Sequence, residues 1–171
     1  MRRVFAALLV LFLVVLPLQN SLAQGEGELV ANGSFAELNA ESGLPEGWFY
    51  EAWLDDAEDR LIETVTDETL KNTVHIVNYI ENDVRLCQTV AVEPDSYYVL
   101  SCDVKPVNVE GGAGANISVR DTFALAAAPF GTSDFSRLEL TGKTASDQET
   151  LTVCIRLGGY SELTSGEAYF S

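Results

Sequence analysis

The chain is poor in the residues on which most enzymes and metal sites depend. Its 171 residues include one histidine and three cysteines, with no Cys-x-x-Cys pair. A structural zinc site would need Cys87, Cys102, Cys154 and His75 to converge from four scattered positions. The sequence also lacks the Gly-x-Ser-x-Gly, His-Glu-x-x-His, P-loop and dinucleotide-binding motifs. We therefore expect no enzyme, although the many acidic residues leave a glycosidase with two carboxylates as an alternative.

Basic residues are also scarce. Ten Lys and Arg stand against 26 Asp and Glu, which gives a formal net charge of −16 at pH 7. Nucleic acids and anionic membrane surfaces are poor partners for such a chain. We interpret the charge as a source of solubility, and we predict that the acidic run Asp55 to Asp59 is a solvated turn and not a metal site.

A long hydrophobic run occurs once, at the start of the chain. Residues 4–18 are almost entirely apolar, follow two arginines and precede Ser21-Leu22-Ala23, which has small residues at the −3 and −1 positions. This pattern predicts a signal peptide over residues 1–23 and a protein that is secreted or faces outward from the cell envelope. An uncleaved anchor helix is the alternative, but Pro17 interrupts the run short of the roughly 20 apolar residues that a membrane span needs.

The remainder, residues 24–171, has the pattern of a single all-β domain. Short runs with β-type composition alternate with turn residues, and no helical period persists. We predict a two-sheet antiparallel β-sandwich with jelly-roll topology, with a barrel as the alternative. The predicted strands are Glu28 to Asn32, Trp48 to Trp53, Leu61 to Val65, Thr73 to Asn78, Val84 to Val92, Tyr97 to Lys105, Ala115 to Arg120, Phe135 to Thr141, Thr150 to Leu157 and Glu167 to Phe170.

Alternation within the strands predicts which side chains share a face. A hairpin of residues 73–78 with 84–92 would put His75 opposite Cys87 and Val77 opposite Arg85 on its outer side. Gln88 would then lie among apolar neighbours, so we expect its amide to hydrogen-bond to nearby backbone.

The same alternation bears on the cysteines. It puts Cys102 on the buried side of its strand and Cys154 on the outer side of another strand. A disulfide between these two residues is therefore not expected, because the bridge needs nearby Cβ atoms. The sequence leaves the pairing of Cys87 undecided.

Five strings in order resemble a known family. They are Val30 to Phe35 (VANGSF), Leu44 to Trp48 (LPEGW), Gln88 to Pro94 (QTVAVEP), Tyr98 to Ser101 (YVLS) and Arg156 to Gly159 (RLGG). Together they resemble the jelly-roll carbohydrate-binding modules of bacterial extracellular enzymes, within the galactose-binding-like superfamily. The resemblance implies a non-catalytic module that binds polysaccharide or glycan and that often carries a structural calcium ion between its first and last strands.

The chain departs from this family in two places. Ala36 stands where the family usually has Glu, and the closing string ends at Phe170-Ser171. An acidic calcium ligand would then be missing or replaced, and the last strand would be truncated. We expect the chain to be part of a longer protein, either an enzyme that acts on polysaccharides or a membrane protein.

Aromatic and planar polar residues are the candidates for sugar binding, because sugar rings stack on aromatic faces and sugar hydroxyls need planar hydrogen-bonding groups. If Trp48 points inward, Tyr50 shares its face and Phe49 and Trp53 take the other. Trp53 is the leading candidate. Arg85 is the second, with an ion pair to Asp83 or Glu81 as its alternative role.

Three further residues are weaker candidates for the same role. They are His75 on the predicted outer face, Tyr79 at the tip of the predicted hairpin and Phe123 beyond the Gly111 to Gly114 turn. The alternative function is a structural or protein-contact module at the amino end of a larger envelope protein. Exposed rings that share no common site would favour that alternative.

Overall fold

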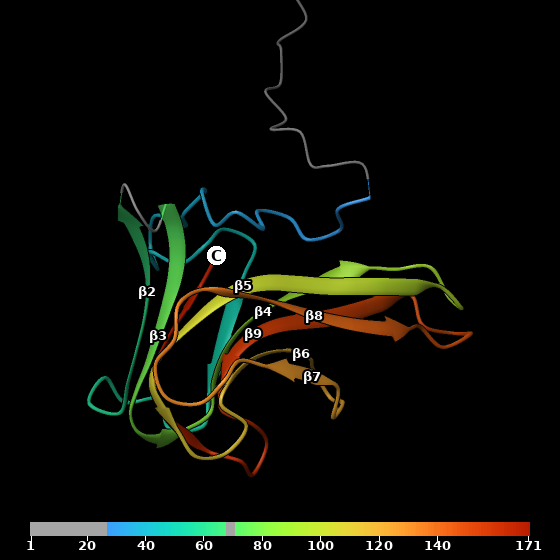
Figure 1. Ribbon diagram of the computed structural model, residues 1–171. Coiled ribbons are helices and arrows are strands. Elements are labelled where there is room, and N and C mark those ends of the chain that lie inside the picture. Colours follow the sequence, from blue (N-terminus) through green and yellow to red (C-terminus); the bar gives the residue numbers. More distant parts are fainter. Residues whose placement is uncertain (1–26, 68–70) are drawn as a thin grey trace, which may run out of the picture.

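The computed structural model describes residues 27–67 and 71–171 as a sandwich of two five-stranded antiparallel sheets (Figure 1). The prediction of an all-β sandwich is therefore confirmed. Within the described residues, no helix has the length and apolar character needed to cross a membrane. The strands are β1 (Phe49–Ala52), β2 (Arg60–Asp67), β3 (Lys71–Asn82), β4 (Val84–Ala91), β5 (Tyr97–Glu110), β6 (Ala115–Val119), β7 (Leu125–Ala127), β8 (Ser136–Lys143), β9 (Thr150–Leu157) and β10 (Thr164–Phe170).

The strand order is that of a jelly roll. The first sheet has the order β1-β4-β9-β6-β7 and the second has the order β2-β3-β10-β5-β8. From β3 to β10 the chain passes repeatedly between the two sheets, and non-consecutive strands become neighbours in each of them. The strands β1 and β2 extend this core by pairing with the edges of β4 and β3.

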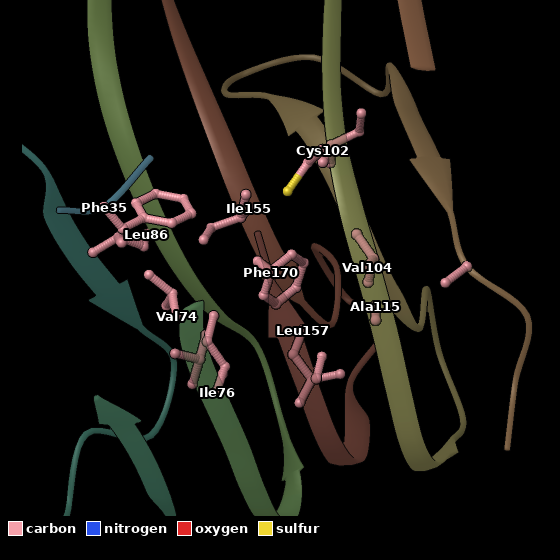
Figure 2. Close-up of a cluster of buried hydrophobic side chains, with 14 of the residues drawn as sticks. Phe35, Val74, Ile76, Leu86, Cys102, Val104, Ala115, Ile155, Leu157 and Phe170 are labelled. Atoms are coloured by element: carbon pink, nitrogen blue, oxygen red, sulfur yellow. The ribbon is translucent and has the colours of Figure 1, made fainter. Parts of the chain in front are cut away.

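The core lies between the two sheets and follows from the period-2 alternation of the strands. Inward-facing side chains from β3, β4, β9 and β10 are fully or almost fully buried. Figure 2 shows Phe170 of β10 near the centre of this cluster, with Ile155 of β9 above it, Leu157 of β9 below it and Val104 of β5 to its right. Phe35 and Trp48, whose rings meet edge to face at 5.3 Å, close one part of it from the amino-terminal segment.

The predicted hairpin between β3 and β4 is wrong, because the two strands belong to different sheets. The chain crosses at Asn82, which is fully buried; its Oδ1 accepts hydrogen bonds from the backbone N–H groups of Leu54 and Asp83. His75 therefore pairs with Glu63 and Tyr169, not with Cys87. The alternation of apolar and polar residues predicts which side chains of a strand face the core. It does not predict which other strand is its hydrogen-bonded neighbour in the sheet.

Other boundaries also differ from the sequence prediction. The predicted strand at residues 28–32 forms bends and turns, and the three-residue β7 has no counterpart among the predicted strands. The closing strand β10 has seven residues and is paired on both sides, with β3 and with β5. That the chain is part of a longer protein stays a prediction.

The side chain of Gln88 confirms the expectation that a buried amide finds backbone partners. Its Oε1 accepts a hydrogen bond from the N–H of Ala31 at 2.7 Å, and its Nε2 donates to the carbonyl of Ala31 at 2.9 Å and to that of Gly47 at 3.3 Å. These bonds attach the irregular amino-terminal segment to β4.

The cysteines divide as the alternation indicates. Cys102 is buried and free on the core side of β5, and Cys154 lies on the outer side of β9. The prediction that these two do not pair is confirmed. Cys154 instead forms a disulfide with Cys87 of β4, its direct neighbour in the first sheet.

Candidate functional site

The outer face of the first sheet brings together most of the polar side chains that could contact a ligand. Strands β1, β4, β9 and β6 each point alternate residues away from the core. We call this surface the arginine face. It consists of Phe49, Glu51, Trp53, Asp83, Arg85, Cys87, Asn116, Ser118, Arg120, Thr152, Cys154 and Arg156.

One row across the face is held by ion pairs. Glu51 lies opposite Arg85, and Arg85 lies opposite Arg156. Oε2 of Glu51 is 2.7 Å from Nη2 of Arg85. Arg156 donates from Nε and Nη2 to the two carboxylate oxygens of Asp83, at 2.6 and 2.5 Å. Such two-point contacts fix the plane of a guanidinium group, so the row is rigid.

A longer ion pair crosses the face. Nη2 of Arg120, just beyond β6, is 2.8 Å from Oε1 of Glu51 on β1. The two long side chains span β4 and β9, which lie between these strands. By register the contact passes over the Cys87–Cys154 disulfide, which explains why both outward-facing cysteines are buried.

An exposed indole borders the row. Trp53 follows β1 and is 72% exposed, and its backbone N–H donates to the carbonyl of Asp83 at 3.0 Å. Phe49, on the same side of β1, is partly exposed. The face therefore has an aromatic edge next to its fixed arginine and carboxylate groups.

The structure unites two of the five predicted site residues. Trp53 and Arg85 lie on the arginine face. Arg85 is ion-paired as expected, but its main partner is Glu51, and Asp83 is 4.0 Å away. Tyr79 is exposed on β3 of the second sheet, and Phe123 is 96% exposed in the turn between β6 and β7.

The fifth predicted residue, His75, lies on the outer face of the second sheet. Its two ring nitrogens are each 3.1 Å from a carboxylate oxygen, one of Glu63 and one of Glu167. Its ring stacks on that of Tyr169 at a centroid distance of 4.1 Å. His75 therefore belongs to an interaction network of its own, apart from Trp53 and Arg85.

Several residues of the face were not found from the sequence. Glu51, Asn116 and Arg120 gave no signal, because their meeting depends on strand order, and Asp83 was named only as a possible partner of Arg85. For Arg156 there was a signal: the alternation of β9 puts it outward together with Thr152 and Cys154. Without the order of the strands, that signal could not be connected to Arg85.

Metal ligands are not grouped in the part of the chain that the structure describes. No three His, Cys, Asp or Glu side chains in residues 27–67 and 71–171 are placed to hold a metal ion. The run Asp55 to Asp59 forms the connection from β1 to β2, and Oδ1 of Asp55 accepts a hydrogen bond from Nε of Arg60.

Two cavities are lined by residues of both sheets. One of about 560 Å³ is lined by apolar residues that include Leu100, Leu140 and Leu151. The other, of about 600 Å³, includes Phe35 and Cys102 in its wall. Neither is lined by Trp53, Arg85 or Glu51.

The buried thiol of Cys102 is not suited to be a nucleophile. Burial raises its pKa to about 12, and the nearby charge of Asp103 acts in the same direction, against a hydrogen bond to the backbone of Ser171. Since the thiolate is the reactive form, Cys102 stays protonated and inert at neutral pH.

Several solved structures are similar to this chain, although no protein-family model and no curated protein sequence matches it. A CBM4 structure has a TM-score of 0.53 and 16% identity, and the match covers 82% of this chain and 94% of that one. The enzymatically active domain of tailspike protein 4 from bacteriophage CBA120 has a TM-score of 0.56 and 15% identity, with 83% of this chain covered. This chain spans only 20% of the tailspike chain.

At these identities the comparisons show the fold alone. The chain has the β-sandwich fold of a carbohydrate-binding module, and a similar sandwich occurs in a chain with enzymatic activity. Because one fold supports many functions, the function must be argued from the site.

Proposed function

We propose that this chain is a non-catalytic carbohydrate-binding module whose ligand lies along the arginine face. The observation that carries the proposal is the position of exposed Trp53 beside the fixed planar groups of Asp83, Arg85 and Glu51. An indole offers a flat apolar surface to the C–H side of a sugar ring, and guanidinium and carboxylate groups hydrogen-bond to its hydroxyls.

The rigidity of the face supports binding. The guanidinium of Arg156 is held at two points by Asp83, and Glu51 contacts both Arg85 and Arg120. Side chains that are already fixed lose little conformational entropy when a ligand binds.

The same ion pairs argue against a glycosidase. A glycosidase needs one carboxyl group that carries a proton and donates it to the leaving group. The two carboxylates of the face, Glu51 and Asp83, each contact arginine within 2.8 Å, so their oxygens are already engaged in ion pairs. Neither is placed to serve as the acid.

The proposal includes the wider setting. We infer that the chain belongs to the galactose-binding-like superfamily, that residues 1–23 are removed as a signal peptide, and that the protein is secreted or faces outward from the cell envelope. Attachment to a larger enzyme or membrane protein is part of the same inference. The predicted signal peptide lies outside the described residues.

A structural or protein-contact module is the second candidate, and one observation favours it. Tyr79 and Phe123 are exposed but lie away from Trp53, on the second sheet and on the β6–β7 turn. These rings share no common site with Trp53. A protein partner would use such scattered rings, whereas a glycan on the arginine face would not.

Binding to a glycan array and to soluble polysaccharides, measured on the purified secreted form, tests the proposal. We expect weak, saturable binding that falls at least tenfold in Trp53→Ala, because a stacking surface is lost. Tyr79→Ala is the matched control and should bind as the parent does. If the folded protein binds no glycan, the second candidate function takes the place of the first.

A further inference from the structure

The core cluster of the sandwich ends before the strands do. On β9 the cluster includes Leu157 and Ile155, whereas the next two inward-facing residues, Val153 and Leu151, line the cavity of about 560 Å³. Leu100 of β5, at the edge of the cluster, lines the same cavity from the other sheet. The cavity thus continues the line of the core beyond its last packed side chains.

Three leucines of the cavity wall are accessible from solvent. Leu100 and Leu140 are register partners on β5 and β8, and Leu151 is the register partner of buried Val90. Each of the three leucines is only partly buried, although it points to the core side of its sheet. Because they point inward and line the cavity, the surface that solvent reaches is available to a ligand there.

The wall has the chemistry of a site for an aliphatic chain. Small-molecule sites have volumes of about 300–1,000 Å³ and are lined mainly by apolar side chains, and this cavity meets both conditions. The atoms of an unfilled apolar wall lack van der Waals partners on one side. Apolar cavities therefore stay dry and take up small apolar molecules.

A peptide segment is a poor occupant of this cavity. A helix with its side chains is about 10–12 Å across, as wide as the whole spacing of about 10 Å between two packed sheets. An extended segment would place its N–H and C=O groups against aliphatic side chains, which offer them no hydrogen bonds. An unbranched alkyl chain meets neither obstacle.

The polar residues of the lining indicate a neutral head group. Among the described residues that line the cavity, Lys143 is the only basic one, and its Nζ is 3.0 Å from Oδ1 of Asp95. The carboxylate of Glu28 and the net charge of −16 oppose a ligand anion. Oη of Tyr98 accepts a hydrogen bond from the N–H of Glu93 at 2.7 Å, so its proton can be donated to a ligand oxygen.

We propose that this cavity binds a neutral amphiphile that has one alkyl chain and a hydroxyl-bearing head group. The alkyl chain lies against Leu100, Leu140 and Leu151, and the head group lies at Tyr98. The site is separate from the arginine face, because Trp53 is not part of its lining. The inference therefore does not rest on the proposed carbohydrate binding.

Calorimetric titration of the purified secreted form tests the inference. Decan-1-ol and 1-monodecanoylglycerol, kept at concentrations that form no micelles, should bind saturably with one molecule per chain. Decanoate should bind at least tenfold more weakly because of its charge, and butan-1-ol because its chain buries less apolar surface.

Variants that fill the cavity locate the ligand. Leu151→Phe and Leu140→Phe enlarge inward-facing side chains of the wall, and each should weaken decanol binding at least tenfold. Thr89→Phe is the matched control: it adds the same ring on the exposed side of β4, outside the lining, and should bind decanol as the parent does. Trp53→Ala should also keep its decanol binding.

Three results would overturn the inference. They are no saturable binding of either neutral amphiphile by the folded protein, unchanged decanol binding in both Leu151→Phe and Leu140→Phe, and decanoate binding as tight as that of decanol. Failure to bind any glycan would overturn the proposed function and leave the cavity site standing. Melting curves verify that each variant is folded.

Discussion

Arg156 and Asp83 form a two-point ion pair at the end of β9, with Nε to Oδ1 at 2.6 Å and Nη2 to Oδ2 at 2.5 Å. Their side chains are only 9% and 12% exposed. Asp83 directly follows Asn82, the last residue of β3, and precedes the first residue of β4 in the other sheet. The pair therefore fixes both the crossing of the chain and one end of the arginine face.

Asp83→Asn should be among the more destabilising single changes on this face. It leaves the buried guanidinium of Arg156 without its counter-charge, and breaking a buried ion pair costs about 3–5 kcal/mol of unfolding free energy. Urea unfolding monitored by tryptophan fluorescence measures the loss. The matched control is Asp95→Asn, whose exposed pair with Lys143 contributes less than about 1 kcal/mol. Equal losses in the two variants would contradict the structural role of Asp83.

The Cys87–Cys154 disulfide should contribute strongly to stability. It closes a loop with a sequence separation of 67 residues, and chain-entropy arguments assign such a loop about 4 kcal/mol. The double variant Cys87→Ala/Cys154→Ala should therefore unfold at clearly lower urea concentration than the parent. A reducing agent should shift the parent to the same midpoint and leave the double variant unchanged. A parent that is insensitive to reduction would contradict the bond.

The sequence predicts more of the fold than of the site, and the strands β3, β4 and β9 show why. Their alternation correctly identifies the core side of each strand, including the burial of Gln88. It does not identify neighbours, so the prediction paired β4 with β3, whereas the structure pairs it with β1 and β9. In a jelly roll the neighbours of a strand are seldom next to it in sequence, because the chain alternates between sheets.

The arginine face depends on that missing information. Trp53 and Arg85 could be identified from the sequence, because each is a residue type suited to sugar binding at a position predicted to face outward. Their connection through Glu51 requires the β1–β4 pairing, and the contact of Arg120 with Glu51 requires the order β1-β4-β9-β6 as well. His75 was assigned to the wrong surface for the same reason: the predicted hairpin put it beside Cys87.

Gln88 should hold the amino-terminal segment on the sandwich. Gln88→Leu keeps the side chain close to its original size but removes the two hydrogen bonds to the backbone of Ala31. Because Ala31 is exposed and water can replace the lost partner, the cost is about 0.5–1.5 kcal/mol for each bond. Hydrogen exchange should become faster in residues 30–47, whereas β9 should keep its protection. Thr89→Val, on the exposed side of the same strand, is the matched control. Unchanged exchange in residues 30–47 would show that other contacts hold the segment.

Cys102 should make the protein less stable at alkaline pH. Its pKa is raised by burial from 9.0 to about 12 in the folded state, so the unfolded state loses the thiol proton first as the pH rises. The stabilising contribution of the neutral thiol is complete below about pH 9 and is lost between about pH 9 and 12, at roughly 1.4 kcal/mol per pH unit. Cys102→Ala removes this dependence, although it also creates a small cavity whose cost does not vary with pH.

The comparison of Cys102 with Cys102→Ala is best made in the Cys87→Ala/Cys154→Ala background, where an ionised thiol finds no disulfide to attack. Urea unfolding at pH 8, 9, 10 and 11 should show the unfolding free energy of the Cys102 protein falling more steeply above pH 9 than that of the alanine variant. Parallel profiles would mean that the thiol ionises as easily in the folded chain as in the unfolded one, and hence that Cys102 is open to solvent.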